Sequence, residues 1–241
     1  MSGKKIIIFG GNGFVGSRVT KYAVEAGWNT IVACRSGAPS AAQSLEPWAH
    51  KAQYISIDAL SRSQVFECLD DHPDTYAIVS CIGALTTANM EGRRLNGDAT
   101  INMAAGLFER KAIRKLIFVS AADMQPVNRV LKGYYQGKRA AEKAILENLG
   151  DRGVVLRPGM IYGTRNVSIG GVSVPLPIGI VGAPMKTIFQ PIHKVAPFGI
   201  LTPPVSVDDV AKACVWGAEE ASVHGKYDVY GINDLASNYH V

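Results

Sequence analysis

Residues 5–16 read KIIIFGGNGFVG, an apolar run that ends in a glycine-rich turn. The apolar run predicts a buried β-strand, and residues 14–26 after it have helical periodicity. Gly10, Gly13 and Gly16 give the spacing GxxGxxG between this strand and this helix. Missing side chains there permit a tight turn and a close approach of a pyrophosphate, whose charge the helix N-terminus attracts. The stretch therefore predicts a dinucleotide-binding α/β fold.

Strand and helix patterns alternate along the chain. The expected buried strands are residues 5–9, 29–34, 53–57, 76–81 and 116–120, and the expected helices are residues 14–26, 61–71, 96–111 and 206–221. The strand segments are continuously apolar, which is typical of strands covered on both faces of a parallel sheet. We predict an α/β fold of the Rossmann type, a doubly wound parallel sheet, in a single domain over residues 1–241.

Residues 159–205 break this alternation, because glycine and proline recur throughout them (GGVSVPLPIGIVGAP, then FGILTPP). We expect a small irregular region there that forms a substrate pocket or a lid. Every window of about 20 residues in this region contains proline or charge, so no membrane-spanning helix is expected.

The composition is that of a folded globule, with 47% apolar and 19% charged residues. The net charge of +5 suits an anionic ligand or membrane surface, but no basic stripe with interleaved aromatic residues indicates nucleic acid. The cysteines are far apart and have no histidine at ligand spacing, so we expect no metal site and no disulfide framework. The residues MSGKK lead directly into the first strand, so no transit peptide is expected.

The end of the second expected strand bears on which nucleotide binds. NAD-specific sites usually place an acidic residue there, but this chain continues with Arg35 and Ser36 and has no Asp or Glu between Glu25 and Glu46. Arg35 can pair with a 2′-phosphate, and Ser36 can donate a hydrogen bond to it. We therefore expect NADP(H) to be preferred over NAD(H); the alternative is an ordinary surface arginine.

Tyr134 and Lys138 are four residues apart on an expected helix, so they can face one pocket. An ammonium group nearby would stabilise the phenolate and lower the pKa of the tyrosine. Such a tyrosine can donate a proton to a carbonyl oxygen as hydride arrives. The pair is thus a candidate catalytic acid with its helper, and the alternative is a solvated helix start. Tyr135 has the wrong spacing and is expected to pack.

Taken together, these motifs resemble the extended or atypical short-chain dehydrogenase/reductases. GGNGFVG resembles the family's cofactor loop, YYQGKRAAE its YxxxK segment, VVLRPGMIYG its RPG element and PPVSVDDVAKA its late helix entrance. Within that superfamily the chain is most similar to plant and algal mitochondrial members. It is more distantly similar to the dehydrogenase-like protein associated with coenzyme Q synthesis and to the Rossmann-type accessory subunit of complex I. The resemblance implies a mitochondrial protein; otherwise a cytoplasmic one is expected.

The resemblance also implies a set of cofactor contacts. Asp58 would lie near the adenine, Ile82 and Gly83 near a ribose, residues 158–161 near the nicotinamide, and Lys138 on the nicotinamide ribose. The full expected set is Gly10, Asn12, Gly13, Phe14, Val15, Gly16, Arg35, Ser36, Asp58, Ile82, Gly83, Lys138, Pro158, Gly159 and Ile161.

The stretch SAAD at residues 120–123 departs from the family pattern. Active members carry a hydroxyl just past the fifth strand that hydrogen-bonds the substrate oxygen, and here that position falls on Ala122. Loss of one such donor costs on the order of a hundredfold in rate. Ser120 is the candidate replacement, if the loop is shifted.

Two functions of different classes follow. The first is an NADP(H)-binding oxidoreductase with weak activity on an apolar carbonyl or quinone-like substrate, linked to respiratory or quinone metabolism. The second is a non-catalytic subunit of a mitochondrial membrane complex that uses bound nucleotide to stabilise its fold. Tyr134 and Lys138 favour the first, and Ala122 favours the second.

Residues 184–198 (PMKTIFQPIHKVAPF) carry apolar side chains at intervals of three and four with basic flanks. This pattern is typical of a helix that lies on an anionic membrane surface or contacts a membrane complex. The alternative is that the segment packs on the domain and covers the cofactor pocket.

Overall fold

The computed structural model describes residues 3–125, 127–169, 172–178 and 202–240. Its centre is a parallel seven-stranded sheet in the order β10-β6-β5-β4-β1-β2-β3. The strands are β1 Lys5–Phe9, β2 Asn29–Cys34, β3 Gln53–Ser56, β4 Thr75–Ser80, β5 Lys115–Val119, β6 Gly153–Leu156 and β10 Gly225–Tyr227. The chain winds outward from β1 in both directions, so the strand order reverses between β1 and β4. Ligands of such sheets bind outside the carboxyl ends of the strands at this point.

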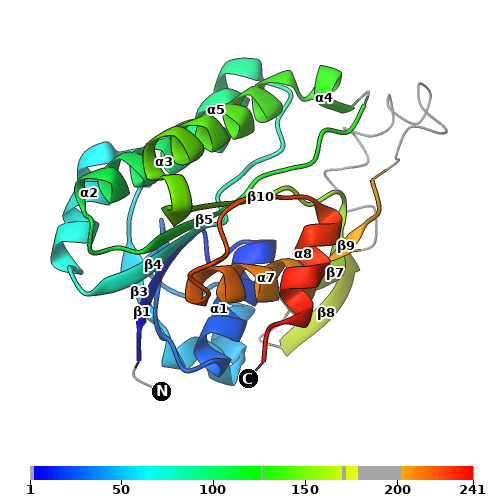
Figure 1. The fold of residues 1–241 in the computed structure, drawn as a ribbon. Coiled ribbons are helices and arrows are strands. Elements are labelled where there is room, and N and C mark those ends of the chain that lie inside the picture. The colour runs from blue at the N-terminus through cyan, green and yellow to red at the C-terminus, as the bar shows by residue number, and fades with distance from the viewer. Residues whose placement is uncertain (1–2, 126, 170–171, 179–201, 241) are drawn as a thin grey trace.

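Helices cover both faces of the sheet, as Figure 1 shows. On one face lie α2 Arg62–Asp71, α3 Asn89–Glu109 and α5 Lys132–Leu149, and on the other lie α1 Phe14–Glu25, α7 Val207–Glu219 and α8 Val229–Ser237. Shorter helical pieces are η1 Gln43–Leu45, η2 Pro47–Lys51, α4 Val127–Val130 and η3 Gly150–Arg152. No helix in the described ranges is long and apolar enough to span a bilayer. The predicted Rossmann-type α/β fold is confirmed.

Helix α3 begins at Asn89, earlier than the predicted start at residue 96. Its first turns are polar and contain Gly92 and Gly97, so local preference argues against a helix there. Packing overrides this preference, because these glycines let α3 approach the backbone of α5 at Gly133 and Gly137.

A second, small sheet lies beside the carboxyl end of the main sheet. β7 Ile161–Ile169 pairs antiparallel with β8 Val172–Ile178 and parallel with β9 Val205–Ser206. The prediction that 159–205 is irregular was therefore wrong for residues 161–169 and 172–178, which form β7 and β8. The prolines there lie on β8, which is an edge strand of the described sheet, where proline is tolerated. The segment 184–198 lies outside the described residues.

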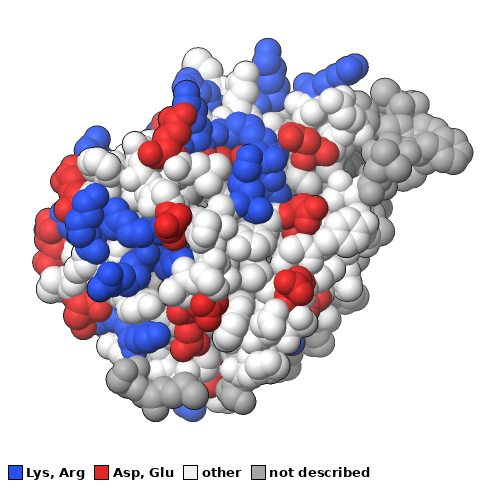
Figure 2. Space-filling view, viewed as in Figure 1, with Lys and Arg blue, Asp and Glu red and all other residues white. Residues whose placement is uncertain are grey.

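Charged side chains are distributed unevenly over the face drawn in Figure 2. On the left, near α2 and α3, basic and acidic side chains mix, in line with the ion pairs Arg62–Glu109 and Arg110–Asp70. At the top, near α4 and α5, basic side chains project from the molecule.

The glycine loop gives a direct test of the fold. A methyl group at Gly16 would lie 2.2 Å from the carbonyl oxygen of Gly10. We expect Gly16→Ala to lower the free energy of unfolding by about 3 kcal/mol, because the strand and the helix would have to separate.

Gly217 in α7 is the matched control, because a methyl group there makes only ordinary contacts of 3.5 Å or more. Gly217→Ala is expected to stabilise by about 0.5–1 kcal/mol. Urea unfolding measures both, and similar values for the two variants would contradict the account.

Candidate functional site

The glycine loop joins β1 to α1 at the reversal of strand order. Gly10 adopts φ +80°, a conformation that favours glycine, and its carbonyl oxygen accepts a hydrogen bond from Gly13 N at 2.9 Å. Gly13 is the N-cap of α1 and makes no side-chain hydrogen bond to the helix, and the first turn of the helix has no acidic residue. The amide groups of this turn can therefore donate to an anion.

Two side-chain amides tie the glycine loop to the chain that follows β2. Asn12 Nδ2 donates to Ser36 Oγ at 3.1 Å and to the carbonyl of Ala38 at 2.9 Å. Gln43 Nε2 donates to the carbonyl of Gly11 at 2.8 Å, and this glutamine is buried. The Oδ1 atom of Asn12 is buried without a partner among the described residues. These bonds hold the expected 2′-phosphate site beside the expected pyrophosphate site.

Arg35 and Asp58 lie at the carboxyl ends of β2 and β3. Both side chains are exposed. The Asp58 carboxylate accepts a hydrogen bond from Leu60 N at 3.0 Å. The predicted adenosine contacts thus share the sheet edge on which the glycine loop lies.

A cleft of about 360 Å³ runs from the glycine loop to the start of α5. The predicted site residues that line it are Gly13, Phe14, Val15, Gly83, Ser120, Tyr134, Lys138, Pro158, Gly159 and Ile161. The predicted residues outside its lining are Gly10, Asn12, Gly16, Arg35, Ser36, Asp58 and Ile82. The structure therefore places the expected pyrophosphate-binding turn and the Tyr134–Lys138 pair along one cavity.

Sequence reasoning missed the apolar wall of this cleft. Leu85, Met124, Val127 and Leu131 line it, and the last two belong to α4 and the turn into α5. Val127, Leu131 and Tyr135 recur every four residues, which is the signal that could have identified the wall.

Lys138 is buried, and its Nζ donates to the carbonyl oxygens of Ile82 at 3.0 Å and Val119 at 2.8 Å. Burial lowers the pKa of Lys138 to about 7. Gly83 leaves room for it, because a methyl group there would lie 3.1 Å from Nζ.

Tyr134 shares the cleft with Lys138, whose Nζ lies 5.8 Å from the centre of the tyrosine ring. Burial raises the pKa of Tyr134 well above its ordinary value. The expectation that Lys138 lowers this pKa was wrong, because desolvation of the phenolate dominates. Tyr134 accordingly keeps its proton at neutral pH.

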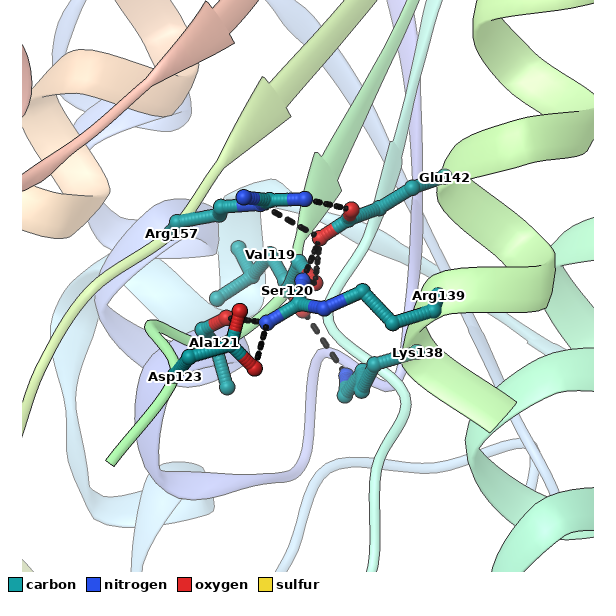
Figure 3. A network of polar contacts seen from close by, with 8 residues as sticks. All are labelled: Val119, Ser120, Ala121, Asp123, Lys138, Arg139, Glu142 and Arg157. Atoms are coloured by element: carbon teal, nitrogen blue, oxygen red, sulfur yellow. Dashed lines mark hydrogen bonds and ion pairs between the residues drawn. The ribbon is translucent and has the colours of Figure 1, made fainter. Parts of the chain in front are cut away.

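Ser120 follows β5 directly, and its hydroxyl is part of a buried polar network (Figure 3). Ser120 Oγ donates to Glu142 Oε1 at 2.5 Å, and Glu142 also pairs with Arg139 and Arg157. The bond to Glu142 raises the pKa of Arg157. The hydroxyl expected to replace a substrate-binding donor is thus directed to a carboxylate.

The residues after Ser120 offer the cleft no hydroxyl. Ala121 lines the cleft, whereas Ala122 N donates to the carbonyl of Pro158 at 2.8 Å. Arg139 holds this segment on α5 through the carbonyl of Ala121 at 2.7 Å and the Asp123 carboxylate at 3.0 Å.

Within the described residues no group of three or more His, Cys, Asp or Glu side chains could hold a metal ion.

Known proteins share both the sequence pattern and the fold. A family model described as NAD(P)H-binding matches residues 10–174. The chain therefore belongs to this NAD(P)H-binding family, with a Rossmann-type fold. The glycine loop, whose close backbone contacts leave no space for side chains, fits such a nucleotide.

Individual proteins are similar to this chain in sequence or in fold. An uncharacterised chloroplastic protein of Arabidopsis thaliana is 30% identical over 243 residues, covering 97% of this chain and 78% of the relative. MIOREX complex component 2 of Saccharomyces cerevisiae is 32% identical over 69 residues, covering 28% of this chain and 25% of the relative. The crystal structure of Bordetella bronchiseptica WbmF in complex with NAD+ matches with a TM-score of 0.66 at 17% identity, over 97% of this chain and 76% of that one.

The lowered pKa of Lys138 predicts a pH dependence of stability. Between about 7 and the ordinary 10.5, the unfolded chain holds a proton at this site that the folded protein lacks. The free energy of unfolding of nucleotide-free protein should therefore rise as pH increases from 7 to 8, by at most about 1.4 kcal/mol from this group. Lys138→Met should remove that part of the rise in urea unfolding at the two pH values. An equal rise in both proteins would contradict the prediction.

Proposed function

We propose that this protein is an NADP(H)-dependent reductase of apolar carbonyl compounds, quinone-like ones included. One observation carries the proposal: a single cleft joins the glycine loop to Tyr134 and Lys138 and has an apolar wall beside them. A site for a small apolar molecule needs such a wall with few polar groups.

The side chains of the cleft have distinct roles in this reaction. NADPH, when bound there, would supply the hydride. Tyr134 donates its phenolic proton to the carbonyl oxygen, which its raised pKa permits because the group stays protonated. Lys138 binds the nicotinamide ribose, in line with the resemblance stated above. The apolar wall excludes water from the reacting carbonyl.

A second function, a nucleotide-binding subunit without catalysis, is supported by Ser120. Its hydroxyl donates to Glu142, so the side chains of residues 120–122 provide no free hydroxyl for a substrate oxygen. The reductase is therefore expected to be slow, by on the order of a hundredfold relative to a site with that donor. Nucleotide binding with no turnover of any aldehyde, ketone or quinone would favour the subunit.

We also infer an organellar location, linked to respiratory or quinone metabolism. The chloroplastic relative supports a plastid as well as the mitochondrion that the sequence resemblance implies. A fluorescent fusion of the full-length protein in its native cell tests this inference, and a diffuse cytosolic signal would overturn it.

The preference for NADPH rests on Arg35, which is exposed beside Ser36 and the glycine loop. Arg35→Ala should weaken NADPH binding by about 5- to 150-fold, the range for a charge-assisted hydrogen bond, and leave NADH binding nearly unchanged. Calorimetric titration measures both. Arg114→Ala, at the opposite end of the sheet, is the control for a general loss of positive charge. Equal losses for the two nucleotides would contradict the preference.

Catalysis rests on Tyr134. Tyr134→Phe keeps the ring and removes the proton donor, so turnover should fall by about 100-fold or more while the Kd for NADPH stays close to that of the wild type. Tyr230→Phe is the control, because this tyrosine is 70% exposed on α8 and does not line the cleft. Undiminished turnover in Tyr134→Phe would show that another group supplies the proton.

A further inference from the structure

Three large apolar side chains are exposed around the mouth of the cleft. Met90 is 88% exposed, Leu85 44% and Val130 38%. Leu85 also lines the cleft, and Val130 ends helix α4, whose first residue Val127 lines it too. Apolar surface thus continues from the substrate cavity to the outside of the protein.

These side chains lie on elements that are in contact. Asn89 begins α3, and its Oδ1 accepts a hydrogen bond from Gly133 N at the start of α5. A methyl group at Gly133 would lie 2.0 Å from the carbonyl oxygen of Asn89, so the two backbones touch. Met90 follows this contact on α3, and Val130, the last residue of α4, precedes Gly133 by three residues. Met90 and Val130 therefore lie beside this contact and Leu85 lines the cleft, and we call these three exposed apolar residues the patch.

Basic residues surround the patch. Arg93 and Arg94 lie three and four residues after Met90 on α3, and Arg129 and Lys132 flank Val130 and Leu131. All four are exposed, and none forms an ion pair with the described residues.

The far end of α3 differs in this respect. There Glu109 pairs with Arg62, and Asp70 pairs with Arg110. In Figure 2 basic side chains project at the top near α4 and α5, with acidic ones below them, and basic and acidic side chains mix on the left. The exposed acidic residue Glu91 follows Met90, so the four basic residues leave the surroundings of the patch with a net positive charge.

We propose that this surface binds an anionic lipid bilayer. We call it the cleft-mouth surface, and it consists of Leu85, Met90 and Val130 with Arg93, Arg94, Arg129 and Lys132. Exposed apolar side chains insert into the interface of such a bilayer, and its anionic headgroups attract the unpaired basic side chains around them. The inference deepens the proposed function, because an apolar substrate dissolved in the bilayer would then enter the cleft directly.

Vesicle flotation of the full chain tests the proposal. The protein should float with phosphatidylcholine vesicles that contain phosphatidylglycerol, stay behind with phosphatidylcholine alone, and be released by high salt. Arg93→Glu with Arg94→Glu should reduce the partition coefficient roughly thirtyfold or more, and Met90→Asp should reduce it as well.

Matched controls lie at the other end of the same molecule. Phe108 is 50% exposed near the end of α3, and Arg114 is exposed before β5. Phe108→Asp and Arg114→Glu should float like the wild type. Thermal unfolding and NADPH titration of every variant serve as controls for folding and nucleotide binding. Both should be close to those of the wild type, because none of these residues lines the cleft.

Three outcomes would overturn the proposal. The first is no flotation of the wild type at low salt. The second is flotation that survives both the Met90 and the Arg93–Arg94 changes, which would assign membrane binding to another part of the chain, such as residues 184–198. The third is a dimer that Met90→Asp dissociates in light scattering, which would assign the surface to a second copy. Normal flotation without turnover of a water-soluble carbonyl would instead count against the proposed reaction alone.

Discussion

The contact between Gly16 and the carbonyl of Gly10 is the constraint on which the rest of the structure depends. A methyl group would lie 2.2 Å from that oxygen, so α1 can meet β1 at this distance only without a side chain. Because α1 then starts at the reversal of strand order between β1 and β4, its free amide groups face the carboxyl edge of the sheet. Asn12 and Gln43 extend the same surface to the end of β2. The nucleotide site is therefore a consequence of how closely one helix packs on one strand.

Burial shapes the chemistry at the other end of the cleft. Lys138 is held by two backbone carbonyls, and its pKa falls to about 7, while the pKa of Tyr134 rises. A buried tyrosine that keeps its proton is suited to donate it, but Ser120 is bound to Glu142 and does not assist. The buried carboxylate is in turn necessary, since removing it would leave Arg157 without its ion-pair partner among the described residues and Arg139 with Asp123 alone. The Ser120 hydroxyl thus serves the buried network that stabilises the fold, and it is not available to bind a substrate.

The parallel sheet and the position of the glycine loop could be predicted from the sequence, because continuous apolar runs and glycine spacing are visible within a few neighbouring residues. They were not enough for the start of α3, where packing of Gly92 and Gly97 on α5 overrides a weak helix preference. The pairing of β7 with β8 was also missed, because proline frequency hides strands that lie at a sheet edge. The partner of Ser120 could not be foreseen, since Glu142 is distant in sequence and is brought close only by the packing of α5 on the sheet. The direction of the Tyr134 pKa depends on burial, which a spacing of four residues does not reveal.

We infer that the glycine loop and the cleft form one dinucleotide site that selects a 2′-phosphate. The decisive measurement is mass spectrometry of the nucleotide released from freshly purified protein, with its amount measured against the protein. NADP+ or NADPH is expected at close to one molecule per chain, and any empty protein is expected to take up NADPH. Protein that carries no dinucleotide and fails to bind either NADPH or NADH in titration would contradict it, and bound NAD+ alone would contradict the selection of the 2′-phosphate.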